Sequence, residues 1–384
     1  LDDTIIERLL NKENVDRIAE LIQNASTNDQ SYILGTLGQS LAKSVIDLLK
    51  REEKEEIEEL MGYPDDSAGA MMATGVFTLY QDTSCGDALK TLQDQQDAEM
   101  VFYLYITDDN DSLVGVASLR ALATTPSSTL LKDIMARRVH SVRPETDQED
   151  VAQIVAQYNY LAVPVVDSDN RLLGIVTVDD VVDVIREEAT EDFFRMAGAG
   201  KDREILLKSS WENAKVRLPW LFASWLGGVV AASVIGTYEH MIESIIALAA
   251  FIPVIIGMGG NIGTQSSTII VRGMATGRIE VGSELLVLIK ELKVGLILGV
   301  LYGVLLGIFA NLKFIGTDPM LGLVVGLSIA SSMLIAVTVG SFTPLILRKL
   351  EIDPAVAAGP FVTTSIDILG VLLYFVIAGI LLKI

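Results

Sequence analysis

Cysteine and histidine are almost missing from this 384-residue chain, which has one Cys and two His. The single cysteine, Cys85, excludes an internal disulfide and fits a reducing compartment. Together these three side chains are too few to build a transition-metal site. A metal ion bound by this chain is therefore expected to be held by oxygen atoms.

Charged side chains are scarce in the second part of the chain. Residues 218–384 hold nine acidic and eight basic residues, so residues 1–217 carry −20 of the net charge of −21. A net charge this large, combined with 50% hydrophobic residues, does not fit a single globular domain. The acidic part argues against nucleic acid or an anionic lipid surface as a partner and favours cations. An ordinary solvated acidic surface would explain much of this charge but not its clustering.

Five long apolar segments occupy the second part of the chain. They cover roughly 218–238, 244–271, 286–312, 320–347 and 354–382. As a helix, each is long enough to cross the hydrocarbon of a bilayer, which is about 30 Å thick. The sequence therefore predicts an all-α transmembrane domain of five helices at 218–384, surrounded by membrane lipid.

The basic residues between these segments predict the orientation. Eleven lie on the amino-terminal side, namely Lys201, Arg203, Lys208, Lys215, Arg217, Arg272, Arg278, Lys290, Lys293, Arg348 and Lys349, and two, Lys313 and Lys383, lie on the other. This bias places the amino-terminal side in the cytoplasm and the carboxyl terminus outside a cell membrane. The chain starts at Leu1 without the pattern of a signal peptide, so the first segment is also expected to stay in the cytosol.

The first 64 residues have the pattern of a small helical domain. Apolar residues recur at helical spacing over Val15–Ile22 and Ser40–Leu49, and Arg51–Leu60 is typical of a solvated, charged helix. Gly62-Tyr63-Pro64 is expected to end this unit.

Residues 65–130 and 131–196 form an internal repeat. Each copy has two β-type runs joined by an Asp/Asn turn and followed by a helix: Val101–Thr107 with Leu113–Ala117, then Leu161–Val166 with Leu172–Val176. Met72 and Met135 occupy matching places at the start of the two copies. The repeat predicts an α+β domain made of two similar modules.

This repeat resembles a tandem CBS domain, and the stretch Gly174-Ile-Val-Thr-Val-Asp-Asp180 is close to the signature of that family. The resemblance implies that Thr177 and Asp180 hold the ribose and phosphates of an adenosine nucleotide such as ATP. The first copy has Ser118 but carries Ala121 where the Asp would fall, so a second equivalent site is not expected there.

Two helices are predicted between the repeat and the first apolar segment. One acidic helix is expected from Asp179 to about Met196, and Gly198–Gly200 should break it. A connecting helix is then expected at 202–217, within a linking segment at 197–217 that leads directly into apolar sequence. A helix in that place could transmit movement of the acidic domain to the membrane.

Asp367 is the only charged residue between Ala355 and Leu382. If a helix begins at Pro354, Asp367 lies thirteen residues further on, about 20 Å into the span. A carboxylate at that depth is costly, so an ion ligand in a polar pathway is expected. The alternative is structural: an Asp that forms a hydrogen bond to a neighbouring helix.

Two further stretches place polar groups inside apolar sequence. The second span carries the glycine-rich run from Gly257 to Ser267, which includes Asn261 and Gln265. On a continuous helix, Gly359, Pro360, Thr363 and Asp367 would share one face, and Pro360 would free a carbonyl near Val356. Carbonyl, hydroxyl and carboxylate oxygens suit Mg²⁺ or Ca²⁺.

These stretches, GGNIGTQSS followed by Arg272 and DPAVAAGPFVTTSID ending at Asp367, resemble the MgtE family of magnesium channels, as does the order of the domains. The amino-terminal domain is shorter than the family usually shows. The resemblance implies a homodimer with its pore between the second and fifth spans. It also implies metal contacts from Asp367, Asn261, Gly359 and Thr363.

The resemblance gives the acidic domain a role as well, which is closure of the pore when cytosolic Mg²⁺ bridges its carboxylates. The implied regulatory residues are Asp167, Asp169, Asp179, Asp180, Asp202, Glu204 and Glu291.

Three other functions compete with a Mg²⁺ channel. An ion-coupled divalent cation transporter or exporter would share the polar spans. An intramembrane aspartyl protease needs two catalytic carboxylates in opposing spans, whereas each chain supplies one away from the span ends, so no enzyme is expected. A nucleotide-sensing scaffold would not need Asp367.

Overall fold

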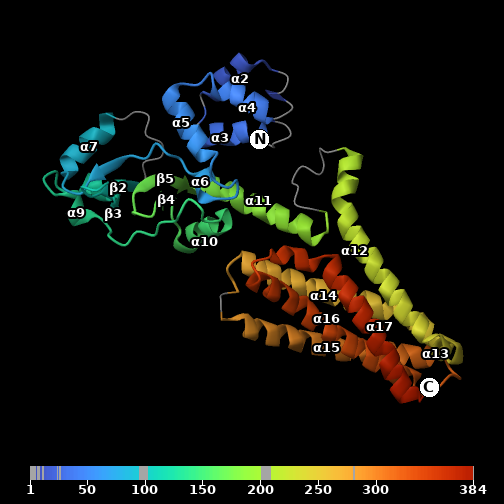
Figure 1. Ribbon diagram of the computed structural model, residues 1–384. Helices are drawn as coiled ribbons and strands as arrows, with labels where there is room; N and C mark the ends of the chain where they lie inside the picture. Colours follow the sequence, from blue (N-terminus) through green and yellow to red (C-terminus); the bar gives the residue numbers. More distant parts are fainter. Residues whose placement is uncertain are drawn as a thin grey trace. The chain divides into compact units, whose positions relative to one another are not determined.

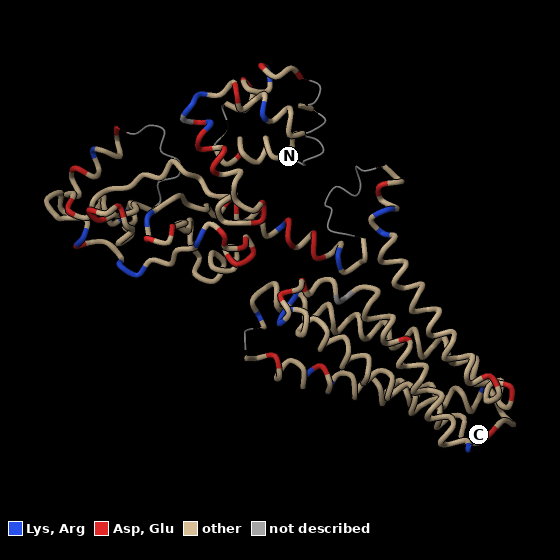
Figure 2. Tube along the Cα trace, in the orientation of Figure 1, with Lys and Arg blue, Asp and Glu red and all other residues tan. Residues whose placement is uncertain are grey.

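A computed structural model describes residues 6, 9–10, 13–23, 25, 27–94, 103–199, 209–279 and 282–383. The chain divides into two units, Leu1–Glu188 and Ala189–Ile384. Figure 1 gives the elements of each. Charged residues are frequent in the first unit and sparse along the helices of the second, as Figure 2 shows.

Four helices form the amino-terminal part of the first unit: α2 (Val15–Ile22), α3 (Thr27–Thr36), α4 (Gln39–Ile46) and α5 (Arg51–Leu60). Their buried core includes Ile18, Leu34, Val45 and Ile57. Helix α3 was not predicted, because its apolar residues do not gather on one face.

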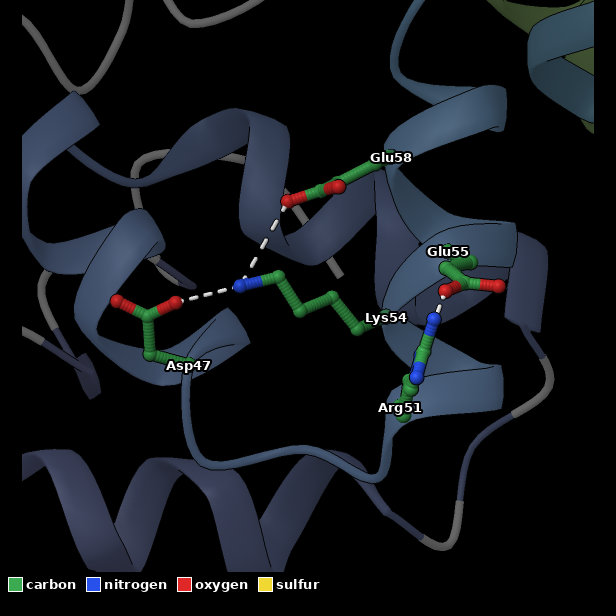
Figure 3. A network of polar contacts seen from close by, with 5 residues as sticks. All are labelled: Asp47, Arg51, Lys54, Glu55 and Glu58. Carbon is green, nitrogen blue, oxygen red and sulfur yellow. Dashed lines mark hydrogen bonds and ion pairs between the residues drawn. The ribbon is translucent and has the colours of Figure 1, made fainter.

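Helix α5 is charged along most of its length, as predicted, and makes local ion pairs (Figure 3). Lys54 Nζ lies 2.5 Å from Asp47 Oδ1 and 3.8 Å from Glu58 Oε1, and Arg51 Nε donates to Glu55 Oε1 at 2.9 Å. The Lys54–Asp47 contact ties α5 to the end of α4, and the other two pairs lie within α5. All of them join largely exposed groups, so their contribution to stability is small.

The two repeats form two small sheets, as the CBS pattern predicted. In the first, β1 (Thr78–Tyr80) pairs in parallel with β2 (Tyr103–Thr107), which pairs antiparallel with β3 (Leu113–Ser118). In the second, β4 (Ala162–Val166) pairs antiparallel with β5 (Leu172–Thr177). The helices around them are α6 (Ala68–Met71), α7 (Cys85–Asp94), α8 (Leu119–Thr124), α9 (Leu131–Ile134), α10 (Gln148–Tyr158) and α11 (Val178–Met196).

The methionine at the start of each repeat packs against a glycine of the other repeat. Met72, at the start of the first repeat, lies so close to Gly174 of the second that a Cβ there would be 2.9 Å from its sulfur. Met135 lies against Gly115 of the first repeat in the same way, with its sulfur 2.5 Å from such a Cβ. Backbone hydrogen bonds join the same segments, from Ala73 N to Ile175 O and from Ala136 N to Val116 O. Each repeat therefore completes the core of the other.

The second unit contains five helices that are long and apolar enough to cross a membrane. They are α12 (Ser210–Thr237), η1 with α14 (Ile246–Phe251 and Ile252–Ala275), α15 (Glu284–Lys313), α16 (Leu321–Lys349) and α17 (Pro360–Leu382). The short helices α13 (Glu239–Ser244) and η2 (Pro354–Ala358) precede α14 and α17. The predicted five spans are confirmed. Helix α12 is continuous from Ser210, so the end of the predicted connecting helix belongs to the first span.

Helices α15 and α16 approach each other along a row of glycines. A Cβ at Gly303 would lie 2.5 Å from the carbonyl oxygen of Gly326, and one at Gly307 would lie 2.6 Å from that of Gly322. Without Cβ atoms the two backbones pack directly, which is how helices associate tightly where lipid removes the hydrophobic driving force.

We expect Gly303→Ala to lower the thermal stability of the purified protein. The added methyl group would meet the backbone of α16, and overpacking of this kind costs roughly 1–3 kcal/mol. The apparent Tm should fall by about 2–10 °C, measured by intrinsic fluorescence in detergent. Gly236→Ala, on α12 with nothing within 4 Å of the new methyl group, is the control and should cause no fall. An equal Tm for both variants would contradict the packing.

Candidate cation pathway and nucleotide site

Asp367 lies beside the glycine-rich part of α14. Its neighbour Ile366 is buried and packs into α14, where a Cβ at Gly263 would lie 2.1 Å from Ile366 Cδ1. A Cβ at Gly260 would lie 3.8 Å from Asp367 Oδ1. The second and fifth spans therefore lie side by side at Asp367 within one chain, while a pore between two copies stays a prediction.

The carboxylate of Asp367 is half-buried, and within the described residues it has no hydrogen bond and no ion pair. In contrast, the deeply buried Tyr374 on the same helix donates its hydroxyl to Leu248 O at 2.8 Å. The alternative of an Asp bonded to a neighbouring helix therefore finds no support within one chain. Its oxygens are available to a cation or to water.

The expected start of the fifth span at Pro354 is wrong, because η2 ends at Ala358 and α17 begins at Pro360. Asp367 therefore lies seven residues into its helix, or about 10 Å. Pro360 occupies the first turn, where its missing N–H costs no hydrogen bond. The expectation that Pro360 lies inside a continuous helix is therefore wrong as well, while a free carbonyl near Val356 stays a prediction.

Gly359 and Thr363 both take part in the first turn of α17. Gly359 precedes the helix, and its carbonyl accepts from Val362 N at 3.2 Å and from Thr363 N at 3.5 Å. The Thr363 hydroxyl donates to Pro360 O at 3.2 Å. Pro360, Thr363 and Asp367 share a face of α17, because their spacings are three and four residues. Gly359 is not on that helical face, since it is the residue before the helix.

Asn261 and Gln265 are exposed on α14, one turn apart. Neither amide has a hydrogen-bond partner among the described residues. Two polar side chains on the outer face of a spanning helix need water or another chain, since lipid offers no hydrogen bonds. Both amides were predicted to be polar groups within a span, and their i, i+4 spacing is a further signal in the sequence that places them on one face.

Glu291 is buried in α15 and lies away from this face. It is 6% exposed, and its Oε2 accepts from the Ser266 hydroxyl of α14 at 2.8 Å. This contact joins α14 and α15, so the carboxylate already has a partner inside the bundle.

Asp167 and Asp169 occupy the turn between β4 and β5. Oδ1 of Asp167 accepts from Asp169 N at 2.9 Å and from Arg171 N at 2.8 Å, which shapes the turn. Asp169 is exposed, and its backbone carbonyl accepts from Ser112 Oγ at 3.2 Å. One of the two carboxylates therefore has a structural role, while that of Asp169 faces solvent.

Thr177 and Asp180 meet where β5 passes into α11. The Thr177 hydroxyl donates to Asp180 Oδ2. Burial raises the pKa of the Asp180 carboxyl above its ordinary value, and the hydrogen bond from Thr177 opposes this rise. In the first repeat, Ser118 caps α8 by accepting from Ala121 N at 3.1 Å, and no carboxylate takes the place of Asp180.

Among the described residues, the predicted regulatory acids form no metal-binding group. Asp179 is exposed in the first turn of α11, and Asp202 and Glu204 lie outside the described residues. Across the described ranges, no three His, Cys, Asp or Glu residues form a group that could hold a metal ion. A divalent cation bridging these acids would need ligands from elsewhere, such as water or a second chain.

Comparison with known proteins gives matches along most of the chain. Family models match residues 252–377 (divalent cation transporter), 68–126 and 131–187 (CBS domain), and 1–66 (MgtE intracellular N domain).

The curated relatives include the magnesium transporter MgtE of Enterococcus faecalis, which is 39% identical over 86% of this chain and 73% of its own length. MgtE of Thermus thermophilus is 35% identical over 96% of this chain and 80% of its own length. A solved cytosolic domain of the Mg²⁺ channel MgtE in complex with ATP is 34% identical, with a TM-score of 0.47, over 48% of this chain and 76% of its own.

Proposed function

Because this chain belongs to the MgtE family of magnesium transporters, we propose that it is a Mg²⁺-selective channel of the cell membrane that cytosolic Mg²⁺ closes. The observation that carries this proposal is the Asp367 carboxylate, which has no cationic partner within the described residues and lies beside Gly260. A carboxylate left unpaired in a spanning helix is a site for a passing cation.

The pore forms between two copies of the chain in this proposal. The exposed amides of Asn261 and Gln265 support it, because they place hydrogen-bonding groups on an outer face of α14. Two Asp367 carboxylates related by symmetry would attract a dication strongly. Mg²⁺ releases its water reluctantly, so a wide polar path that passes it hydrated lowers the cost of entry.

Single-channel recording from the purified protein in a defined bilayer tests this function. We expect unitary currents carried by Mg²⁺ that stop when Mg²⁺ on the side of the amino-terminal domains reaches millimolar levels. Flux that occurs without unitary currents and depends on a Na⁺ or pH gradient would contradict the channel and favour an ion-coupled transporter.

Adenosine nucleotide binding at Thr177 and Asp180 is the second part of the proposal. The solved ATP complex of a relative and the pairing of these two side chains support it. At the start of a helix, a carboxylate can accept hydrogen bonds from ribose hydroxyls. A hydroxyl there can donate a hydrogen bond to a phosphate.

We expect Asp180→Asn to weaken ATP binding about tenfold or more, because an amide replaces a charged hydrogen-bond acceptor. Titration calorimetry on the full-length chain measures this, with the exposed neighbour variant Asp179→Asn as control.

The effect of Asp180→Asn on the free energy of unfolding should differ from its effect on ATP binding. The native state holds the Asp180 proton more tightly than the unfolded chain, so this residue favours folding below about pH 3.8, an effect lost as pH rises through the raised pKa. Asp180→Asn removes that pH dependence and should not lower stability at pH 7. In the calorimetric titration, an unchanged ATP affinity of the Asp180→Asn protein would contradict the nucleotide site.

A further inference from the structure

The carboxyl end of α11 is joined to the segment that precedes the fifth span by a cluster of three charged residues. The Arg195 guanidinium pairs with Glu191, one turn earlier in α11, and with Asp353, which precedes η2. These side chains are 13%, 15% and 29% exposed, so the cluster is largely shielded from water. The last two turns of α11 belong to the same unit as the membrane helices.

Asp353 uses its two oxygens for two different tasks. Oδ1 accepts from Ala355 N at 2.8 Å and caps η2, while Oδ2 pairs with Arg195. The short helix η2 leads through Gly359 into α17, which carries Asp367. A single carboxylate therefore links Arg195 to the turn that precedes α17.

Backbone contacts support the same junction. A Cβ at Gly359 would lie 3.8 Å from the carbonyl oxygen of Arg195 and 3.7 Å from that of Met196. Gly198, with φ +66°, ends α11, and a Cβ there would lie 3.5 Å from Pro360 Cδ and 3.7 Å from Trp220 Cβ. The end of α11 thus packs on the first turn of α17 and on α12 together.

We propose that Arg195 is a positioning residue that couples α11 to the entrance of the cation pathway. Its guanidinium neutralises two carboxylates from different segments. Without it, Glu191 and Asp353 would face each other as shielded like charges, which repel strongly where water is scarce. Movement of α11 would then no longer reach Gly359 and Pro360. The expected effect on closure of the pore rests on the proposed channel function. The contact between Arg195 and Asp353 does not.

A disulfide cross-link tests the contact independently of transport. The separation of 3.7 Å between the two Cβ positions at Gly198 and Trp220 suits a disulfide. The single native thiol permits a clean background, Cys85→Ser. We expect the full-length Gly198→Cys/Trp220→Cys protein to cross-link readily in membranes.

Adding Arg195→Gln should lower the rate of cross-linking severalfold. Arg186→Gln is the matched control, because Arg186 lies on the same helix and forms an ion pair with Asp183 in which both side chains are exposed. No cross-link in the parent protein, or an equal rate in the Arg195→Gln and Arg186→Gln proteins, would overturn the proposal.

Single-channel recording tests the consequence. Arg195→Gln should leave unitary conductance unchanged, because Arg195 pairs with Glu191 and Asp353 and not with Asp367, but should raise the Mg²⁺ concentration for half-closure at least threefold. Asp353→Asn, which keeps the cap of η2 and removes the charge, should act in the same direction, and Arg195→Lys should restore part of the wild-type response. A half-closing concentration that is unchanged or lower in Arg195→Gln would overturn the coupling. Absence of current in the wild type would instead overturn the channel function. The cross-linking experiment would then still test the contact of α11 with α12 and α17.

Discussion

Replacing Asp367 with Asn should abolish Mg²⁺ flux, to at least about 100-fold below wild type, in liposomes loaded with a Mg²⁺-sensitive dye. Asn keeps the size of the side chain and removes its charge, so a cation entering the membrane would lose the attraction that offsets its partial dehydration. The variant should remain folded, because among the described residues no partner depends on this carboxylate.

The matched control is Ser365→Ala on the same helix. The Ser365 hydroxyl donates to Phe361 O at 2.8 Å, so it is satisfied within its own helix and its removal should leave flux near the wild-type value. Elution volume and Tm in detergent separate loss of transport from loss of folding. Wild-type flux in the Asp367→Asn protein would exclude the pore assignment.

Neutralising three carboxylates of the second CBS repeat should keep the proposed pore conducting at millimolar Mg²⁺. In the triple variant Asp167→Asn, Asp169→Asn and Asp179→Asn, the concentration for half-closure should rise at least about tenfold, because fewer charges remain for divalent ions to bridge. The turn should survive, since Asn at position 167 can still accept the two N–H groups that Asp167 Oδ1 accepts now.

An equal change in net charge on the first repeat is the control for this variant. Asp108→Asn, Asp109→Asn and Asp111→Asn remove three charges as well, and Asp108 shapes its turn as Asp167 does, by accepting from Asn110 N and Ser112 N. Recordings at stepped Mg²⁺ concentrations compare the two triple variants. Normal closure in the first variant, or the same loss in both, would count against a sensor at the second repeat.

The apolar and alternating patterns predicted most of the fold, because burial dictates both. Five runs of apolar residues became five spanning helices, and the two β-type runs of each repeat became β2 to β5. Helix α3 was not predicted, because its apolar residues do not lie on one side of the helix. Its conformation depends on tertiary contacts, which the local sequence pattern does not show.

Asp367 could be singled out as a candidate site from the sequence, because a charge in an apolar run is itself a signal. The start of α17 was not, because Pro is compatible with both a kinked helix and a helix start, and only the packing around Gly359 decides between them. Arg195 gave no signal in sequence. It lies in a charged helix, and its partner Asp353 is 158 positions away.

Because Met72 packs on the second repeat and Met135 on the first, neither repeat is expected to be stable without the other. A chain that ended after the first repeat would leave Gly115 uncovered and Met72 without a place to insert, so a lone half would expose both apolar surfaces to solvent. Duplication must therefore have been retained as a whole, and grafting this CBS pair onto another transporter should succeed only when both repeats are included.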